Sequence, residues 1–99
     1  MGNIKKVILS MTQKKEKSEP LLFEAKYINF GCGKEKVDGY CNVDNDPNVK
    51  PAVLWDLNVY PLPFKDNSAE MLRAYNVLEH LKEPQKFLEE CYRIMKPGG

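Results

Sequence analysis

The chain has 99 residues, with 15 Lys and Arg against 14 Asp and Glu and a formal net charge of +1 at pH 7. A chain of this length forms at most one small domain, which buries roughly two-thirds of its unfolded surface. The nearly neutral charge disfavours broad electrostatic binding to nucleic acid or to an anionic membrane, because such binding needs a concentrated basic face.

The cysteines and the apolar runs bear on the compartment. No apolar run approaches the ~20 residues that cross a bilayer, so we expect a cytoplasmic protein without a membrane span. Cys32, Cys41 and Cys91 form no CxxC pair, and their odd number suits a reducing compartment. Without clustered His or Cys the sequence predicts no metal site.

The residue composition changes along the chain. Residues 1–19 are rich in lysine, and we interpret them as a basic N-terminal arm. From residue 20 onward short apolar runs alternate with turn residues, so we place a domain at 20–99. Its predicted strands are 27–30, 40–43, 52–55 and 70–75, and each is followed by a glycine or a polar residue.

A helix is predicted over 84–96, after a shorter helical piece over 77–81. Pro84 suits the first helical position, and Glu89 can pair with Arg93 at a spacing of i, i+4. Pro97-Gly98-Gly99 is expected to end the helix. The apolar residues that share one helical face are Phe87, Leu88, Cys91, Ile94 and Met95.

Short strands with polar ends, followed by a helix, predict a parallel α/β sheet, in which ligands bind outside the carboxyl ends of the strands. If the spatial order is 3-2-1-4, Gly31, Asp44 and Asp56 form a line ~10 Å long, since neighbouring strands are ~4.8 Å apart. That length is about the distance from a small polar tail through a ribose to a base in a nucleotide-like ligand. The third glycine of a dinucleotide fingerprint is replaced by Lys36, so a nucleotide-like ligand without phosphates fits better.

Each strand end also has a purely structural interpretation. Gly31 and Gly33 let a ligand approach the backbone and meet its amides, or they only make a tight turn. Asp44 can hold two vicinal hydroxyls, or it can close a turn with Asn45 and Pro47. Asp56 can accept a hydrogen bond from an exocyclic amine, or it can cap a turn. Considered singly, these alternatives stay open.

Five motifs occur in order: INFGCG at 28–33, NVD at 42–44, DL at 56–57 with LPFKDNS at 62–68, NVLEHL at 76–81, and RIMKPGG at 93–99. Together they resemble the class I S-adenosylmethionine-dependent methyltransferases, and most closely the small-molecule type with GCG, LEHL and KPGG motifs. The resemblance covers about residues 26–99. It implies a Rossmann-like sheet with flanking helices, and S-adenosylmethionine as cofactor.

The resemblance also implies roles for single residues. The glycine turn corresponds to the loop beside the methionine part of the cofactor, Asp44 to the acid that binds the ribose hydroxyls, and Asp56 with Leu57 to the pair beside adenine. Asn76 corresponds to the position that faces the methyl donor. The implied cofactor-binding set is Gly31, Cys32, Gly33, Asp44, Asn45, Asp56, Leu57 and Asn76.

The implied reaction is an in-line methyl transfer from a sulfonium to a small-molecule acceptor that the sequence does not identify. The thioether is a good leaving group, so catalysis rests on holding the methyl donor and the acceptor in line. A base is needed only if the acceptor must lose a proton. Asn76 and His80 are the weak catalytic candidates, His80 because it is the chain's one histidine. Glu79 and His80 have an equally strong interpretation as a structural pair.

Family members continue beyond the position that corresponds to Gly99, so the sequence predicts the cofactor-binding half of such a domain, truncated before a fifth strand. The fourth strand would then be an exposed edge, which favours a homodimer, unless the apolar residues at 7–9 cover it. The alternative function is a non-catalytic binding or interaction module that folds by self-association. Whether the chain is active alone, and its oligomeric state, are open at this stage.

Overall fold

The computed structural model describes residues 22–99. The predicted basic arm at 1–19, its apolar residues at 7–9 and the predicted domain boundary lie outside the described residues. Within 22–99 no helix has both the length and the apolar character needed to cross a membrane.

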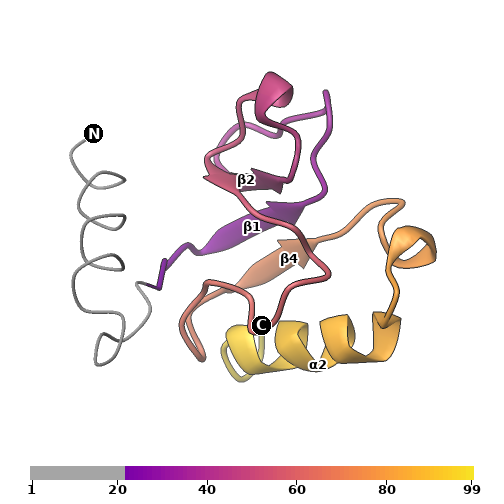
Figure 1. Cartoon of the computed structure of the whole chain (residues 1–99). Helices are drawn as coiled ribbons and strands as arrows, with labels where there is room; N and C mark the ends of the chain where they lie inside the picture. Colours follow the sequence, from indigo (N-terminus) through magenta and orange to yellow (C-terminus); the bar gives the residue numbers. More distant parts are fainter. Residues whose placement is uncertain (1–21) are drawn as a thin grey trace, which may run out of the picture.

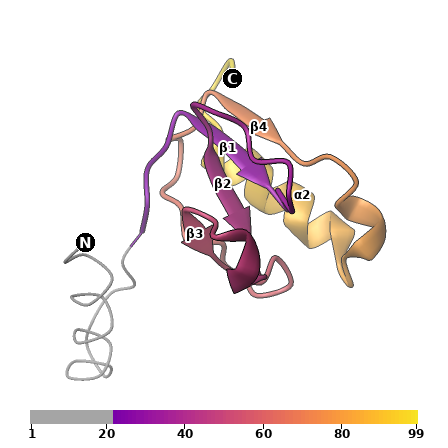
Figure 2. The ribbon, with the colours of Figure 1, turned by 90° about the horizontal axis from the view of Figure 1, so that it is seen from above.

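Four short strands form one parallel sheet (Figures 1 and 2). They are β1 (Tyr27–Phe30), β2 (Cys41–Asp44), β3 (Val53–Leu54) and β4 (Met71–Arg73). Their spatial order is β3-β2-β1-β4, which confirms the predicted order and the Rossmann-like α/β class. In the register, Phe30 lies beside Val43, and Val43 lies beside Val53. The carboxyl ends of the three strands therefore meet at one edge of the sheet.

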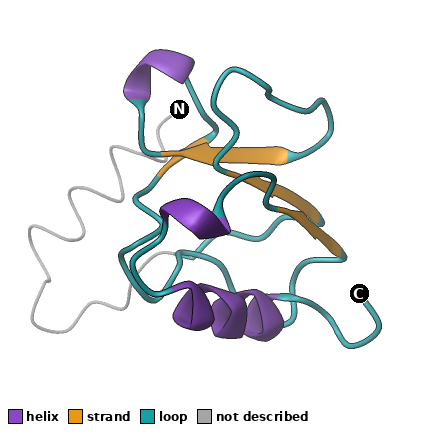
Figure 3. Cartoon of the chain, turned by 90° about the vertical axis from the view of Figure 1, so that its right-hand side faces the viewer, coloured by secondary structure: helices purple, strands orange, loops and turns teal. Residues whose placement is uncertain are grey.

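Helix α2 (Pro84–Ile94) lies along one side of the sheet, as Figures 1 and 3 show. The contact is aromatic at its centre, where the rings of Phe30 and Phe87 meet edge to face with centroids 5.3 Å apart. Ile28, Phe64 and Ile94 are fully buried in the same core. Two single-turn 3-10 helices, η1 (Pro47–Val49) and η2 (Leu78–His80), complete the described elements. The predicted helical piece at 77–81 thus forms as η2.

Helix α2 ends earlier than the sequence predicts. Its last residue is Ile94, because Met95 turns into extended backbone and forms a bridge with Ala69. The amide of Lys96 then donates to the carbonyl of Ala69 at 2.7 Å. The Pro-Gly-Gly signal therefore does not end the helix. Leu88, predicted on the apolar face, lies at its margin with 47% of its surface exposed.

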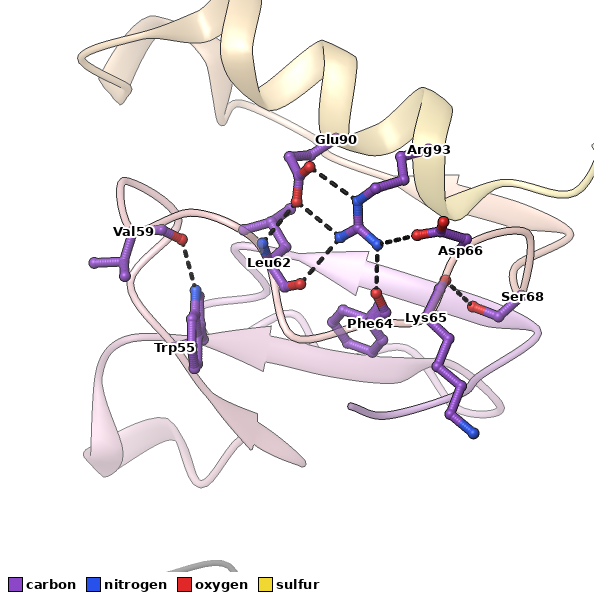
Figure 4. Close-up of polar contacts among 9 residues, drawn as sticks. All are labelled: Trp55, Val59, Leu62, Phe64, Lys65, Asp66, Ser68, Glu90 and Arg93. Carbon is purple, nitrogen blue, oxygen red and sulfur yellow. Dashed lines mark hydrogen bonds and ion pairs between the residues drawn. The ribbon is translucent and has the colours of Figure 1, made fainter. Parts of the chain in front are cut away.

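Arg93 fixes the segment between β3 and β4 to α2 (Figure 4). Its guanidinium donates to Asp66 and to the carboxylate of Glu90, at 2.7–2.9 Å. It also donates to the carbonyl oxygens of Leu62 and Phe64, at 3.1 and 2.8 Å. The predicted pairing with Glu89 is wrong, because α2 turns Glu90 rather than Glu89 toward the loop, where Glu90 also accepts from the amide of Leu62.

Candidate functional site

A cavity of about 270 Å³ opens at the carboxyl ends of the four strands. Segments that follow every strand contribute to it, as expected for an open parallel sheet. Six residues of the predicted cofactor set line it, together with His80, whereas Cys32 and Gly33 do not. The lining residues are Gly31, Asp44, Asn45, Trp55, Asp56, Leu57, Asn58, Asn76, Val77, His80 and Leu81.

The glycine turn after β1 uses its backbone amides within the protein. The amides of Gly31 and Cys32 both donate to the carbonyl of Val43, at 2.8 and 3.1 Å. The amide of Gly33 donates to Asp44 Oδ2 at 2.8 Å. These three amides are therefore already bonded within the protein, as in the tight-turn interpretation, and a ligand at this turn stays a prediction. Among the described residues, the carbonyl oxygens of Gly31 and Gly33 accept no hydrogen bond, so the turn offers acceptors to a ligand.

Gly31 is also required by its surroundings. Its φ of +65° lies in the left-handed region, and a Cβ at this position would stand 2.7 Å from Val77 Cγ2. Val77 is buried and follows β4. The absence of a side chain at Gly31 therefore lets the segment after β4 lie directly against the end of β1.

Asp44 ends β2 and is half-buried. Its Oδ1 accepts from the amide of Asp46 at 2.9 Å, and its Oδ2 accepts from the amide of Gly33 at 2.8 Å. The turn-closing interpretation is thus correct, and the same carboxylate still lines the cavity. Since each carboxylate oxygen can accept more than one hydrogen bond, Asp44 keeps acceptor sites for a ligand. The exposed Asn45 lies beside it.

Asp56, on the segment after β3, has the same double character. Its Oδ1 accepts from the amide of Asn58 at 2.9 Å, which caps a turn, and Asp56 is also among the residues that line the cavity. The neighbouring Leu57 is buried. Trp55 is held against this loop, because its indole Nε1 donates to the carbonyl of Val59 at 3.0 Å (Figure 4). The loop therefore contributes an acidic, an aliphatic and an aromatic residue to the lining of the cavity.

The opposite wall follows β4. Asn76 is exposed and has a φ of +55°, a left-handed conformation that Asn tolerates better than most residues. His80 lines the cavity, but its side chain is 76% exposed, and its Nε2 lies 4.0 Å from Glu79 Oε2. A polar contact that is so exposed contributes little to stability. Among the residues that sequence reasoning missed, Trp55 and Asn58 flank Asp56 and Leu57, whereas Val77 and Leu81 carry apolar side chains without a functional signal.

The thiols offer no activated nucleophile. Burial raises the pKa of Cys32, with a smaller contribution from the nearby Asp44 carboxylate, and burial also raises the pKa of Cys41. Burial with the charge of Glu90 raises the pKa of Cys91 to about 12. All three are therefore protonated at neutral pH. Within residues 22–99 no cluster of three or more His, Cys, Asp and Glu side chains could hold a metal ion.

A parallel sheet of this order with a helix packed on one face defines a Rossmann-like α/β domain. Residues 36–99, more than half of the chain, match the family model described as a methyltransferase domain. The chain therefore belongs to the methyltransferase domain family, whose members use S-adenosylmethionine. This result confirms the resemblance seen in the sequence motifs.

Similar proteins carry related names. An uncharacterised methyltransferase of Schizosaccharomyces pombe is 43% identical over 42 residues, which are 42% of this chain and 15% of the relative. A probable S-adenosylmethionine-dependent methyltransferase of Mycolicibacterium smegmatis is 38% identical over 42 residues, 42% of this chain and 16% of the relative. A ubiquinone/menaquinone biosynthesis C-methyltransferase of Pseudoalteromonas translucida is 34% identical over 67 residues, 68% of this chain and 24% of the relative.

The matched region thus spans between about a seventh and a quarter of these relatives' own length. Comparison with solved structures gives no match.

Proposed function

We propose that residues 20–99 form the cofactor-binding half of a methyltransferase domain, and that the cavity at the strand ends holds S-adenosylmethionine. The observation that carries the proposal is the meeting of Gly31, Asp44 and Asp56 around one cavity. Its volume of about 270 Å³ lies just below the ~300–1,000 Å³ that is usual for ligand sites. A cavity of this size suits the adenosine part of the cofactor, with the methionine part lying along the glycine turn.

The acceptor groups fit this placement. Asp44 receives the ribose hydroxyls on the acceptor sites that its turn leaves open. Asp56 and Leu57 lie beside the adenine, where the indole of Trp55 adds an aromatic surface. The carbonyl oxygens of the glycine turn suit an ammonium group, which donates hydrogen bonds, better than a phosphate, which accepts them. Asn45 and Asn76 complete the lining near the two ends of the ligand.

The bound cofactor would supply a sulfonium methyl group, and the residues of this chain would hold it in line with an acceptor. We expect a small-molecule acceptor. Asn76 and His80 remain the candidates for a catalytic role, Asn76 at the turn after β4 and His80 at the exposed rim. Proton removal by His80 is required only for an acceptor that must be deprotonated.

Titration calorimetry with S-adenosylhomocysteine tests the proposal. We expect saturable binding by the wild-type chain and about 10- to 100-fold weaker binding by Asp44→Ala, since a hydrogen bond to a charged group contributes about 1.5–3 kcal/mol. Asp38→Ala is the matched control, because Asp38 is exposed and does not line the cavity. A folded wild-type chain that binds no S-adenosylhomocysteine contradicts the proposal and favours the alternative, a non-catalytic interaction module.

A further inference from the structure

The two walls of the cavity follow the two edge strands of the sheet. One wall, residues 55–58, follows β3, and the other, residues 76–81, follows β4. Because the strand order is β3-β2-β1-β4, these strands lie at the two ends of the sheet (Figure 2). In the part of the chain that the structure describes, a single hydrogen bond joins residues 55–59 to residues 76–82, from the amide of Lys82 to Asn58 Oδ1 at 2.9 Å.

The β3 wall is fixed from several directions. The amide of Asn58 donates to Asp56 Oδ1 and the amide of Val59 donates to the carbonyl of Asp56, both at 2.9 Å. The indole of Trp55 closes the same loop through Val59. Further along, Glu90 and Arg93 bind both backbone groups of Leu62. This wall therefore has more hydrogen bonds than the β4 wall, and Asn58 lies on it.

The β4 wall has fewer supports of its own. It consists of Asn76 in a left-handed conformation, followed by η2, a single turn with no side-chain cap at Val77 and no buried residue within it. Its backbone contacts are local, from the amides of His80 and Leu81 to carbonyls three residues earlier. Exposed single turns with few buried contacts open at little free-energy cost. Its position over the cavity therefore depends on contacts at its two ends.

Those two ends are held differently. At the first, Val77 packs against Gly31 and the core. At the second, Leu81 is partly buried against the core, and the bond from the Lys82 amide to Asn58 joins the segment to the opposite wall. We propose that Asn58 is a positioning residue, whose side-chain oxygen holds the end of the η2 segment across the cavity and keeps the site in its binding-competent width. This inference rests on the function proposed above, because it concerns the affinity of that same site.

A loss of this bond lowers affinity without removing a ligand contact. If η2 moves away in part of the molecules, the apparent association constant falls in proportion to the fraction of molecules that remains binding-competent. Asn58 lines the cavity as well, so the two roles of its amide must be separated. Asn58→Asp keeps an acceptor for the Lys82 amide and loses the side-chain N–H donor. Asn58→Ala loses both groups, and Asn58→Leu loses both while it keeps the number and branching of the side-chain heavy atoms.

The experiment first measures hydrogen exchange of the Lys82 amide by NMR in the ligand-free protein. We expect at least fivefold faster exchange in Asn58→Ala and Asn58→Leu, and near wild-type protection in Asn58→Asp. Asn48→Ala is the matched control, since Asn48 is exposed and does not line the cavity. Unchanged protection of Lys82 in Asn58→Ala overturns the inference without any ligand.

Titration with S-adenosylhomocysteine then completes the test. We expect 5- to 10-fold weaker binding by Asn58→Ala and Asn58→Leu, and recovery to within twofold of wild type by Asn58→Asp. If Asn58→Asp protects Lys82 but binds as weakly as Asn58→Ala, the residue acts by direct contact and the inference is overturned. Unaltered binding by Asn58→Ala overturns it too. Failure of the proposed function gives a different result, because the wild-type chain itself then binds no S-adenosylhomocysteine. The inference about Asn58 is overturned in that case as well.

Discussion

Asp44 and Asp56 each close a backbone turn and line the cavity at the same time. For each residue the sequence leaves a choice between turn and ligand, but a carboxylate has two oxygens and several acceptor sites, so the roles are compatible. In Asp44 both oxygens accept a backbone amide. The turn bonds therefore orient the carboxylate before a ligand arrives, which lowers the ordering cost of binding.

Gly31 supports the same site by having no side chain. We predict that Gly31→Ala lowers the free energy of unfolding by about 2–4 kcal/mol, because a left-handed L-residue costs about 1–2 kcal/mol and the new methyl group adds a steric clash. That clash is with Val77 Cγ2, which would lie 2.7 Å from the new Cβ. Urea unfolding followed by circular dichroism measures the change.

Gly33→Ala separates the two causes in this prediction. Gly33 also has a positive φ, of +53°, but a Cβ there meets nothing within 4 Å. Its substitution should therefore cost only the conformational part, about 1–2 kcal/mol. In a Val77→Ala background, Gly31→Ala should cost about as much as Gly33→Ala. Equal costs for the two glycine substitutions in the wild-type background would refute the steric argument.

At the scale of elements, α2 both covers the core and anchors the loop that carries the β3 wall. Phe87 and Ile94 provide the first function through burial. Glu90 and Arg93 provide the second through hydrogen bonds to the backbone of Leu62 and Phe64 (Figure 4). A planar guanidinium with five donors can serve several acceptors at once, which a lysine cannot.

The Glu90–Arg93 pair predicts how stability depends on pH. The hydrogen bond from Arg93 is the main cause that holds the pKa of Glu90 below its ordinary value of 4.5. A lowered pKa in the folded state contributes stability above the unfolded pKa, and this stability is lost as pH falls through the folded pKa. We predict that Glu90→Gln is about 1–2 kcal/mol less stable than wild type at pH 7, and that the difference shrinks below about pH 4.5.

Glu89→Gln is the matched control for this prediction. Glu89 is exposed, and among the described residues it forms no salt bridge, although the sequence spacing favours it as the partner of Arg93. Its substitution should change the free energy of unfolding by less than about 0.5 kcal/mol at either pH. Urea titrations at pH 7 and pH 4 provide the comparison. A pH-independent difference between wild type and Glu90→Gln would exclude the charge interaction as its cause.

The elements that could be predicted are those whose signals are local. The predicted bounds of β1 are its true bounds because Gly31 ends the strand, and Pro84 marks the true start of α2. The end of α2 could not be predicted, because a tertiary bridge between Met95 and Ala69 ends it before the Pro-Gly-Gly sequence. The choice of Glu90 over Glu89 is tertiary for the same reason.

In the site, too, some residues could be predicted from the sequence and others could not. Strand-end residues such as Asp44 and Asp56 could be predicted, since a parallel sheet brings its carboxyl ends together. Asn58 and Leu81 could not, because they reach the cavity only through the path of the loops. The hydrogen bonds of the amides in the glycine turn were also hidden, since their acceptors, the carbonyl of Val43 and the carboxylate of Asp44, belong to another strand.

At the scale of the whole molecule, the sheet is covered unevenly. Helix α2 packs on one face, and β4 has β1 as its single strand neighbour within the described residues. Gly99 approaches the backbone at the start of this edge, where a Cβ on it would stand 3.0 Å from the carbonyl oxygen of Glu70. Further along, Met71 and Tyr75 are 51% and 65% exposed. An edge of this kind is a surface to which another strand can pair.

We therefore predict that the chain self-associates through the β4 edge. Sedimentation equilibrium should show an apparent mass that rises with concentration from 11.4 kDa toward twice that value. Met71→Lys should shift the curve toward the monomer, because a charge at an edge strand opposes pairing. Leu88→Lys is the matched control, since Leu88 is similarly exposed, at 47%, but lies on α2. A monomer at all concentrations, or an equal response to both variants, would show that the β4 edge is not the contact.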